Sequence, residues 1–336
     1  MHYPDVQNDP VISFCHEWLS EKSIFKLTTS GSTGTPKEIS ISRNAMLSSA
    51  LKTIAFFNLK KGDKSLLCLN TAFIGGKMML VRAMEAEMEM YVTPPSSMPL
   101  TSDLPAQDFA AFVPLQLHDI LSINKFDEFL NRMKGIIVGG AAISEKLEEL
   151  CRRLSCPVYS TYGMTETVSH VALKRINSNN PDSCYTTLPG ILIGQTKEGC
   201  LEISGDVTEN RLVKTNDVVR LINKNQFEWL GRKDNIINTG GVKVQIELLE
   251  RKIEPILKGL NIYFNFIIAS MPDDKLGERI VMVAESNVTD ESKIMEMLKS
   301  NLDKYEIPRK IIFCAPFSYT TSGKIDRIAT IRSIKR

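Results

Sequence analysis

The sequence has few of the residues that mark metal enzymes and secreted proteins. It holds four histidines, none of them paired at metal-ligand spacing, and seven scattered cysteines without a C-x-x-C motif. The histidine pattern argues against a zinc or iron enzyme. An odd number of cysteines without a framework spacing is typical of reduced thiols in a cytosolic protein. We therefore expect a cytoplasmic location.

A charge excess and long apolar runs are also missing. The 336 residues include 41 basic and 39 acidic side chains, which leaves a net charge of +2. This balance gives no reason to expect a nucleic-acid partner. The N-terminus lacks the basic and then apolar pattern of a signal peptide, and no apolar run is long enough to span a bilayer. We predict neither nucleic-acid binding nor membrane insertion.

The sequence does contain a loop rich in glycine and hydroxyl side chains. Residues 27–37 read L-T-T-S-G-S-T-G-T-P-K and follow an apolar run that is typical of a strand. Backbone N–H groups at glycines, hydroxyl donors and a lysine suit such a loop to a polyphosphate. The Walker pattern G-x-x-x-x-G-K-[ST] is absent, and the alternative is a polar surface turn. The candidate phosphate-binding residues are Thr28, Thr29, Ser30, Gly31, Ser32, Thr33, Gly34, Thr35 and Lys37.

Strand and helix patterns alternate over most of the chain. The predicted helices cover 11–20, 42–58, 77–84 and 144–154, and the predicted strands cover 38–42, 65–69, 88–93, 110–113, 135–138 and 157–160. Such alternation predicts an α/β fold with mostly parallel sheets flanked by helices. Short strands at 201–204, 218–221 and 227–230 indicate a small antiparallel unit.

A polar, glycine-rich segment near Asp234 is the expected boundary between two domains. Residues 1–233 would form the nucleotide- and acyl-binding domain, and residues 234–336 a small C-terminal domain. The predicted elements of the second domain are helices over 246–257 and 290–303 and strands over 262–269, 279–285 and 309–314. Their mixture predicts an α+β module.

The block Y-S-T-Y-G-M-T-E-T, residues 159–167, combines groups that suit a nucleotide. The ring of Tyr162 can stack on a base, Thr165 can bond a phosphate, and the carboxylate of Glu166 can hold Mg²⁺. Thr161 and Gly163 belong to the same block. The alternative is a strand-to-helix turn with a capping threonine.

Four other segments add candidates. The small residues Gly139, Gly140 and Ala141 follow a strand, where open α/β sheets usually bind flat ligands. Asp217 can accept from two ribose hydroxyls, and Arg232 can donate to ribose or phosphate. Lys324 lies in T-S-G-K-I-D-R near the C-terminus. Taken singly, Asp217 would be a turn residue and Lys324 a solvated surface lysine.

In this order and spacing, the motifs resemble the adenylate-forming superfamily of acyl-CoA synthetases, luciferases and peptide-synthetase adenylation domains. The resemblance runs from about Phe25 to the C-terminus. Within the superfamily, V-P-L-Q-L (113–117), Y-G-M-T-E-T-V-S-H (162–170) and L-V-R-A-M (80–84) are similar to the o-succinylbenzoate–CoA ligases of menaquinone biosynthesis. The resemblance implies ATP, Mg²⁺ and coenzyme A as ligands.

The resemblance also implies a role for each motif. Lys324, Thr165 and Glu166 would be catalytic, with Glu166 holding the metal. Gly240, Gly241 and Lys243 would join the cofactor site, and Asp234 would be the hinge of a mobile C-terminal domain. Arg82, Ser169 and His170 are candidates for the second carboxylate or the keto group of the acid. The alternative for Arg82 is a surface position on a helix.

The sequence departs from the superfamily at two places. The phosphate loop begins at Thr28, so most of the usual first subdomain is missing, and either residues 1–20 or a second copy would cover the sheet; we favour a homodimer. Phe73 stands about where relatives carry a histidine near the acyl pocket. Three alternatives stay open: a ligase for another aryl or fatty acid, a stand-alone adenylation domain that loads a carrier protein, and a nucleotide-binding relic.

Overall fold

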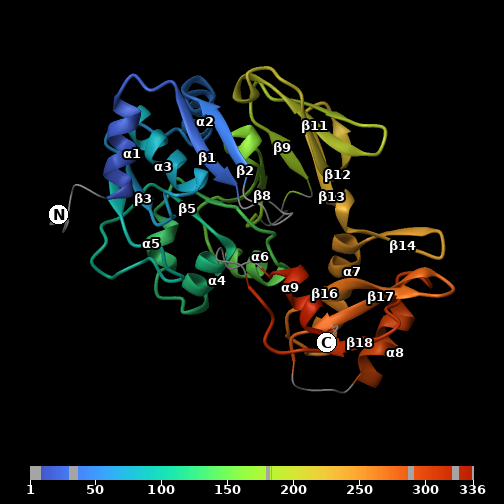
Figure 1. Ribbon diagram of the computed structural model, residues 1–336. Helices are drawn as coiled ribbons and strands as arrows, with labels where there is room; N and C mark the ends of the chain where they lie inside the picture. Colours follow the sequence, from blue (N-terminus) through green and yellow to red (C-terminus); the bar gives the residue numbers. More distant parts are fainter. Residues whose placement is uncertain are drawn as a thin grey trace. The chain divides into compact units, whose positions relative to one another are not determined.

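The computed structural model describes residues 9–29, 37–178, 182, 184–286, 291–319 and 325–334. The chain divides into two compact units, which Figure 1 shows together. The large unit comprises residues 1–194, 202–214 and 221–228, and the small unit comprises residues 195–201, 215–220 and 229–336. The boundary predicted near Asp234 therefore stays a prediction, because the small unit also takes two shorter stretches that precede it.

The large unit begins with a helix, a hairpin and a second helix. Helix α1 (Pro10–Leu19) starts where Asp9 Oδ1 accepts from Val11 N at 2.7 Å, and strands β1 (Ile24–Thr29) and β2 (Lys37–Ser42) pair antiparallel. Ser42 caps helix α2 (Arg43–Phe57) by accepting from Ala45 N at 3.2 Å. Asn58 ends α2 in the left-handed region, where asparagine is tolerated. The predicted cap and length of this helix are confirmed.

Five parallel strands alternate with helices in the middle of the large unit. They are β3 (Lys64–Leu67), β4 (Glu89–Val92), β5 (Phe109–Phe112), β6 (Gly135–Val138) and β7 (Val158–Gly163), and they lie in the order β4-β3-β5-β6-β7. The helices between them are α3 (Ile74–Glu85), α4 (Pro114–Ser122), α5 (Asp127–Asn131) and α6 (Glu145–Cys151). The prediction of a mostly parallel sheet flanked by helices is confirmed for this part.

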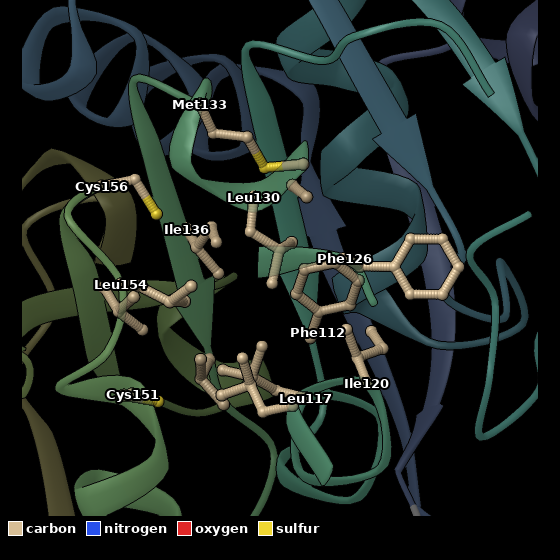
Figure 2. Packing of buried hydrophobic residues seen from close by; sticks show 14 of the residues in the cluster. Phe112, Leu117, Ile120, Phe126, Leu130, Met133, Ile136, Cys151, Leu154 and Cys156 are labelled. Carbon is tan, nitrogen blue, oxygen red and sulfur yellow. The ribbon is translucent and has the colours of Figure 1, made fainter. Parts of the chain in front are cut away.

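The core beside these strands is apolar and densely filled. Figure 2 shows side chains from β5, β6 and helices α4 to α6 packed together: Phe112, Leu117, Ile120, Leu130, Ile136 and Cys151. All six are buried. Burying one large apolar side chain stabilises the fold by about 1.5–3 kcal/mol, so this cluster holds the strand ends in fixed positions.

Beyond β7 the same sheet continues with antiparallel strands. A single turn of 3₁₀ helix, η1 (Thr165–Thr167), leads from β7 into β8 (His170–Arg175), and the sheet then runs β8-β9-β13-β12-β11-β10. These strands are β9 (Tyr185–Thr187), β10 (Leu192–Gln195), β11 (Cys200–Ser204), β12 (Val213–Asn223) and β13 (Gln226–Arg232), with a second 3₁₀ turn, η2 (Asp206–Thr208). The antiparallel strands predicted from the sequence thus join one mixed sheet of 11 strands.

The rest of the small unit is the predicted α+β module. Its sheet has the order β15-β14-β17-β16, with β18 parallel to β17, and helix α7 packs on it through Leu249, Ile253 and Leu257. The elements are η3 (Lys233–Asn235), β14 (Ile236–Thr239), β15 (Val242–Gln245), α7 (Ile246–Gly259), β16 (Phe266–Asp273), β17 (Gly277–Ala284), α8 (Glu291–Asn301), β18 (Ile311–Phe313) and α9 (Arg327–Ile334). The strand predicted over 262–269 begins only at Phe266.

Two further observations concern the whole chain. All seven cysteines are free. Within the part of the chain that the structure describes, no helix is both long enough and apolar enough to cross a membrane.

Candidate active site

The strands β1 and β2 carry the two ends of the predicted phosphate loop. Thr28 pairs with Glu38 and Thr29 with Lys37 across this hairpin. The central loop residues Ser30, Gly31, Ser32, Thr33, Gly34 and Thr35 lie outside the described residues. Strand β2 is in contact with η1. The ends of the loop and the Thr165–Glu166 segment therefore lie in the same part of the large unit, as a shared phosphate site requires.

The turn after β7 is shaped by a glycine and a threonine. A Cβ on Gly163 would lie 2.2 Å from the carbonyl oxygen of Ser169, so only glycine allows this close approach. Thr167 Oγ1 accepts from Met164 N at 3.0 Å and lies 2.9 Å from Ser169 O. These bonds hold η1 in place, with Thr165 half-buried and Glu166 exposed.

The carboxylate of Glu166 fits a divalent cation. It is exposed, and within the described ranges no cationic side chain pairs with it. Mg²⁺ prefers oxygen ligands and is usually held by one or two carboxylates together with substrate phosphates. Among the described residues, no group of three or more histidine, cysteine, aspartate or glutamate side chains could hold a metal ion.

A strained backbone turn separates η1 from β8. Val168 has φ 67° and ψ −59°, and Ser169 N donates to Thr167 O at 2.7 Å. This is the rarer form of γ-turn, and this conformation strains the backbone of a β-branched residue. The Val168 side chain is buried at 1% exposure, and its packing holds the turn. The turn leads through Ser169 into β8, which begins at His170; both are predicted substrate residues.

The predicted substrate residues meet in one buried hydrogen-bond chain. Arg82 Nη2 donates to Ser169 Oγ at 2.9 Å, and Ser169 Oγ lies 3.5 Å from His170 Nδ1. His170 Nε2 lies 3.1 Å from Thr53 Oγ1, which itself donates to Ser49 O at 3.3 Å. Because the Thr53 hydroxyl is used as a donor, we assign the imidazole hydrogen to Nε2. Each donor in this series of hydrogen bonds then points in the same direction, from Arg82 toward Ser49.

Burial shifts the titration of both ionisable groups in this chain. Arg82 is 2% exposed, and burial lowers the pKa of its guanidinium to about 9, so it remains charged at neutral pH. Burial, and then the positive charge of Arg82, lower the pKa of His170 well below 6.5. The imidazole is therefore neutral at neutral pH. The alternative of Arg82 on the surface of its helix is wrong, because α3 turns it inward.

The small residues after β6 allow two strand ends to approach each other. Thr161 Oγ1 on β7 donates to Val138 O at 3.2 Å, and a Cβ on Gly139 would lie 2.1 Å from that hydroxyl oxygen. Gly140 has φ +84°, which favours glycine. Ala141 follows, half-buried. The absence of a side chain at Gly139 therefore allows the Thr161 hydroxyl to lie against the end of β6.

The ring of Tyr162 is more buried than we expect for a ring that stacks on a nucleobase. Its exposed fraction is 9%. Its centroid lies 5.0 Å from that of Phe227, nearly perpendicular, and 5.7 Å from that of Tyr185. Most of the ring is therefore covered by aromatic neighbours from β13 and β9.

In the small unit, Asp217 and Arg232 lie side by side on β12 and β13. Arg232 Nη1 is 3.8 Å from Asp217 Oδ1, and Trp229 Nε1 donates to the same oxygen at 3.2 Å. Arg232 Nη2 also pairs with Asp234 Oδ2 at 2.8 Å, and Asn216 Nδ2 donates to that oxygen at 3.2 Å. The predicted ribose residues and the predicted hinge residue thus share one polar cluster.

The remaining predicted residues of the small unit lie on two other segments. Gly240 and Gly241 form the two-residue turn between β14 and β15, with φ 59° and 81°, and Lys243 is exposed on β15. Lys324 lies outside the described residues, although its neighbour Ile325 pairs with Tyr319.

Sequence reasoning missed Thr53 and Trp229. Thr53 is a threonine within a helix, and nothing in the sequence signals that it contacts His170. Trp229 has a weak signal, since it is one of only two tryptophans. Both belong to the site only through long-range contacts.

Comparison with known proteins identifies the family. The model of the AMP-binding enzyme family matches residues 16–197. The 2-succinylbenzoate–CoA ligase of Bacillus cereus (strain ATCC 10987 / NRS 248) is 23% identical over 97% of this chain and 73% of that protein.

Solved structures of related enzymes support the same family assignment. A protein of Dyadobacter fermentans DSM 18053, described as acyl-CoA synthetase (AMP-forming)/AMP-acid ligase II-like, is 39% identical, with 99% of this chain and 96% of that chain covered and a TM-score of 0.66. O-succinylbenzoate coenzyme A synthetase of Bacillus subtilis, in complex with ATP and magnesium ion, shares the fold with a TM-score of 0.77, at 20% identity over 91% of this chain and 69% of that chain. The chain therefore belongs to the AMP-binding enzyme family, and its predicted membership of the adenylate-forming superfamily is confirmed.

Proposed function

We propose that this enzyme is an AMP-forming acid–CoA ligase that converts o-succinylbenzoate to o-succinylbenzoyl-CoA in menaquinone biosynthesis. Family membership supports the AMP-forming chemistry. The names of relatives, 2-succinylbenzoate–CoA ligases among them, support the acid.

The buried guanidinium of Arg82 is the observation that most strongly supports a dicarboxylate substrate. Among the described residues no carboxylate pairs with it, and its Nε lacks a hydrogen-bond partner. A buried charge without a counter-ion is costly, and an anionic ligand offsets that cost. o-Succinylbenzoate has two carboxylates, so one can react while the other pairs with Arg82.

The chemistry proceeds through two displacements. In the first, a carboxylate oxygen of the acid attacks the α-phosphorus of ATP, the bond to the bridging oxygen breaks, and pyrophosphate leaves. In the second, the thiolate of coenzyme A attacks the acyl carbon, and AMP leaves. A free carboxylate has no comparable leaving group, which is why the acid must first be joined to AMP.

Each predicted residue has a task in the first displacement, which depends mainly on positioning and charge neutralisation. The 28–37 loop would hold the β- and γ-phosphates, Thr165 the α-phosphate, and Asp217 with Arg232 the ribose. Lys324 would stabilise the charge that grows between acid and phosphate. Bound Mg²⁺, held by Glu166, would neutralise phosphate charge.

The second displacement needs other groups near the acyl carbon. We propose that residues beyond Asp234 rotate about it, which withdraws Lys324 and brings the Gly240–Gly241 turn to the pantetheine path. The ion pair of Asp234 with Arg232 lies at this point of the chain, and such a pair must rearrange when backbone torsions at a hinge change.

One experiment tests the proposed function. The protein is incubated with ATP, Mg²⁺ and coenzyme A and a panel of acids: o-succinylbenzoate, benzoate, other aryl acids and fatty acids. Mass spectrometry should detect the thioester of o-succinylbenzoate above the others. If the thioester of another acid is the main product, that acid is the substrate instead of o-succinylbenzoate. If an acyl-adenylate forms but does not react with free coenzyme A, the result favours an adenylation domain that loads a carrier protein. No acid-dependent AMP release at all would favour the relic.

A further inference from the structure

Trp229 makes an unusual contact with the carboxylate of Asp217. Its indole Nε1 donates to Asp217 Oδ1 at 3.2 Å, across the neighbouring strands β12 and β13. Asp217 is only 8% exposed. A hydrogen bond to a buried charged group is stronger than one between neutral groups, so the indole restricts the orientation of the carboxylate.

The tryptophan is itself held by a second residue. Arg251, on α7, donates from Nη1 to the carbonyl oxygen of Trp229 at 3.1 Å, and its guanidinium carbon lies 5.2 Å from the centre of the indole ring. A cation over an aromatic face and a hydrogen bond to the backbone fix both the ring and the strand. The indole is therefore a rigid support for Asp217.

The backbone of Asp217 is held as well. Its N–H donates to Thr215 Oγ1 at 3.0 Å. Arg232 Nη1 approaches Oδ1 at 3.8 Å. The indole N–H and the guanidinium thus both face the same carboxylate oxygen, Oδ1. Together they set the direction in which the carboxylate can accept further hydrogen bonds.

We propose that Trp229 is a positioning residue that orients Asp217 toward the ribose hydroxyls of ATP and so determines the preference for a ribonucleotide. The inference rests on the proposed binding of ATP ribose by Asp217. Two adjacent hydroxyls can donate to one carboxylate only when it is correctly directed. A 2′-deoxynucleotide offers one hydroxyl fewer and therefore loses the benefit of that orientation.

The test compares two nucleotides rather than one. Isothermal titration calorimetry in Mg²⁺ buffer gives the Kd of ATP and of 2′-deoxyATP for wild-type protein and for Trp229→Phe. Phenylalanine keeps an aromatic ring for Arg251 to contact and removes the N–H together with the five-membered ring that carries it. We expect wild-type protein to prefer ATP by about tenfold or more, since a hydrogen bond to a charged group is worth roughly that factor. The preference should fall at least about threefold in Trp229→Phe.

Trp18→Phe is the matched control. Trp18 lies on α1 in the large unit and donates from its own Nε1 to Glu85 Oε1 at 2.9 Å, far in sequence from Asp217. This variant also loses one indole hydrogen bond to a carboxylate, but it should keep the wild-type preference. Asp217→Asn should lose most of the preference for ATP over 2′-deoxyATP. Its remaining preference is the smallest value expected for any of these variants.

A second measurement does not depend on the folding of Trp229→Phe. The Trp18→Phe variant retains Trp229 as its one tryptophan, so its emission should change on addition of ATP and change less with 2′-deoxyATP at the same occupancy. An unaltered preference in Trp229→Phe, equal weakening for both nucleotides, or identical emission changes would overturn the inference. Wild-type protein that binds neither nucleotide would overturn the proposed function and the inference together.

Discussion

The imidazole of His170 couples the stability of the large unit to pH. Burial, and then the charge of Arg82, lower its pKa well below 6.5 in the folded protein. Above pH 6.5 the imidazole is neutral in the folded and unfolded states alike. Below pH 6.5 the unfolded state binds a proton that the folded state takes up only at lower pH, so stability falls as the pH falls. The slope is at most about 1.4 kcal/mol per pH unit for this one group.

Urea unfolding at pH 7.5 and pH 5.5 checks this prediction. The free energy of unfolding of wild-type protein should fall between the two pH values, and His170→Gln should remove part of that fall. His118→Gln, at a half-exposed histidine on α4, should retain all of it. A fall in His170→Gln as large as that in wild-type protein would contradict the assigned role of burial.

Arg82 provides a kinetic prediction at the same scale. Arg82→Lys keeps a positive charge but cannot form two parallel bonds to a carboxylate. The KM for o-succinylbenzoate should rise by about tenfold or more, corresponding to about 1.4 kcal/mol, while the KM for ATP stays within error. The exposed Arg132→Lys is the control. If both KM values rise together, Arg82 supports the fold rather than the acid.

Within helix α3, two adjacent glycines should respond differently to the same substitution. A Cβ on Gly76 would lie 2.6 Å from the carbonyl oxygen of Asn70, which is backbone and cannot move away. A Cβ on Gly75 would meet only Leu69 Cδ1 at 3.7 Å, an ordinary contact. Gly76→Ala should cost about 1–3 kcal/mol, whereas Gly75→Ala should be neutral or stabilise by up to about 1 kcal/mol.

Urea unfolding midpoints of the two variants are the measurement. Because both substitutions add one methyl group to the same helix turn, the difference between them isolates the close approach of the chain at Asn70. Equal midpoints would show that this approach relaxes without cost.

The elements that the sequence predicts best are those specified by local signals. Helix α2 has a cap at Ser42 and an asparagine that ends it at Asn58, and both operate as the residue types suggest. Strands β5 and β6 are short apolar runs with all residues buried. In each case the residues themselves carry the information.

Other elements depend on contacts that no local pattern reveals. Strand β8 was missed because it exists only if the chain reverses at Val168, in a backbone conformation that valine rarely adopts. The glycine pair at 240–241 is a common hairpin turn, yet in sequence it was indistinguishable from a flexible boundary. Strand β16 begins later than predicted. After α7 ends, Asn261 has a left-handed backbone conformation, and the strand starts only beyond it, at Phe266.

At the scale of the whole molecule, the motif order was sufficient to predict the fold class and the family. The candidate residues were only partly predictable. Arg82, Ser169 and His170 were recognised as substrate candidates, but the hydrogen-bond chain continues from His170 to Thr53 on α2, which the sequence did not signal. Likewise Asp217 was predicted alone, whereas Trp229 reaches it only through the register of β12 and β13.

If Lys324 acts only in the first displacement, its removal should affect the two steps differently. Lys324→Ala should slow formation of the acyl-adenylate by about 10²–10³. Thioester formation from supplied acyl-adenylate should change little, because the proposed rotation about Asp234 would withdraw the lysine in that step. Single-turnover measurements of each step separate the two. Equal losses in both steps would contradict a role confined to the first displacement.

The central claim is that an organic acid takes AMP from ATP at this enzyme. Acid-dependent exchange of labelled pyrophosphate into ATP tests it most directly, because exchange reports the first displacement and its reversal alone. We predict exchange that requires o-succinylbenzoate and Mg²⁺ and proceeds without coenzyme A. Absence of exchange with every acid, or exchange that appears only when coenzyme A is present, would contradict the account.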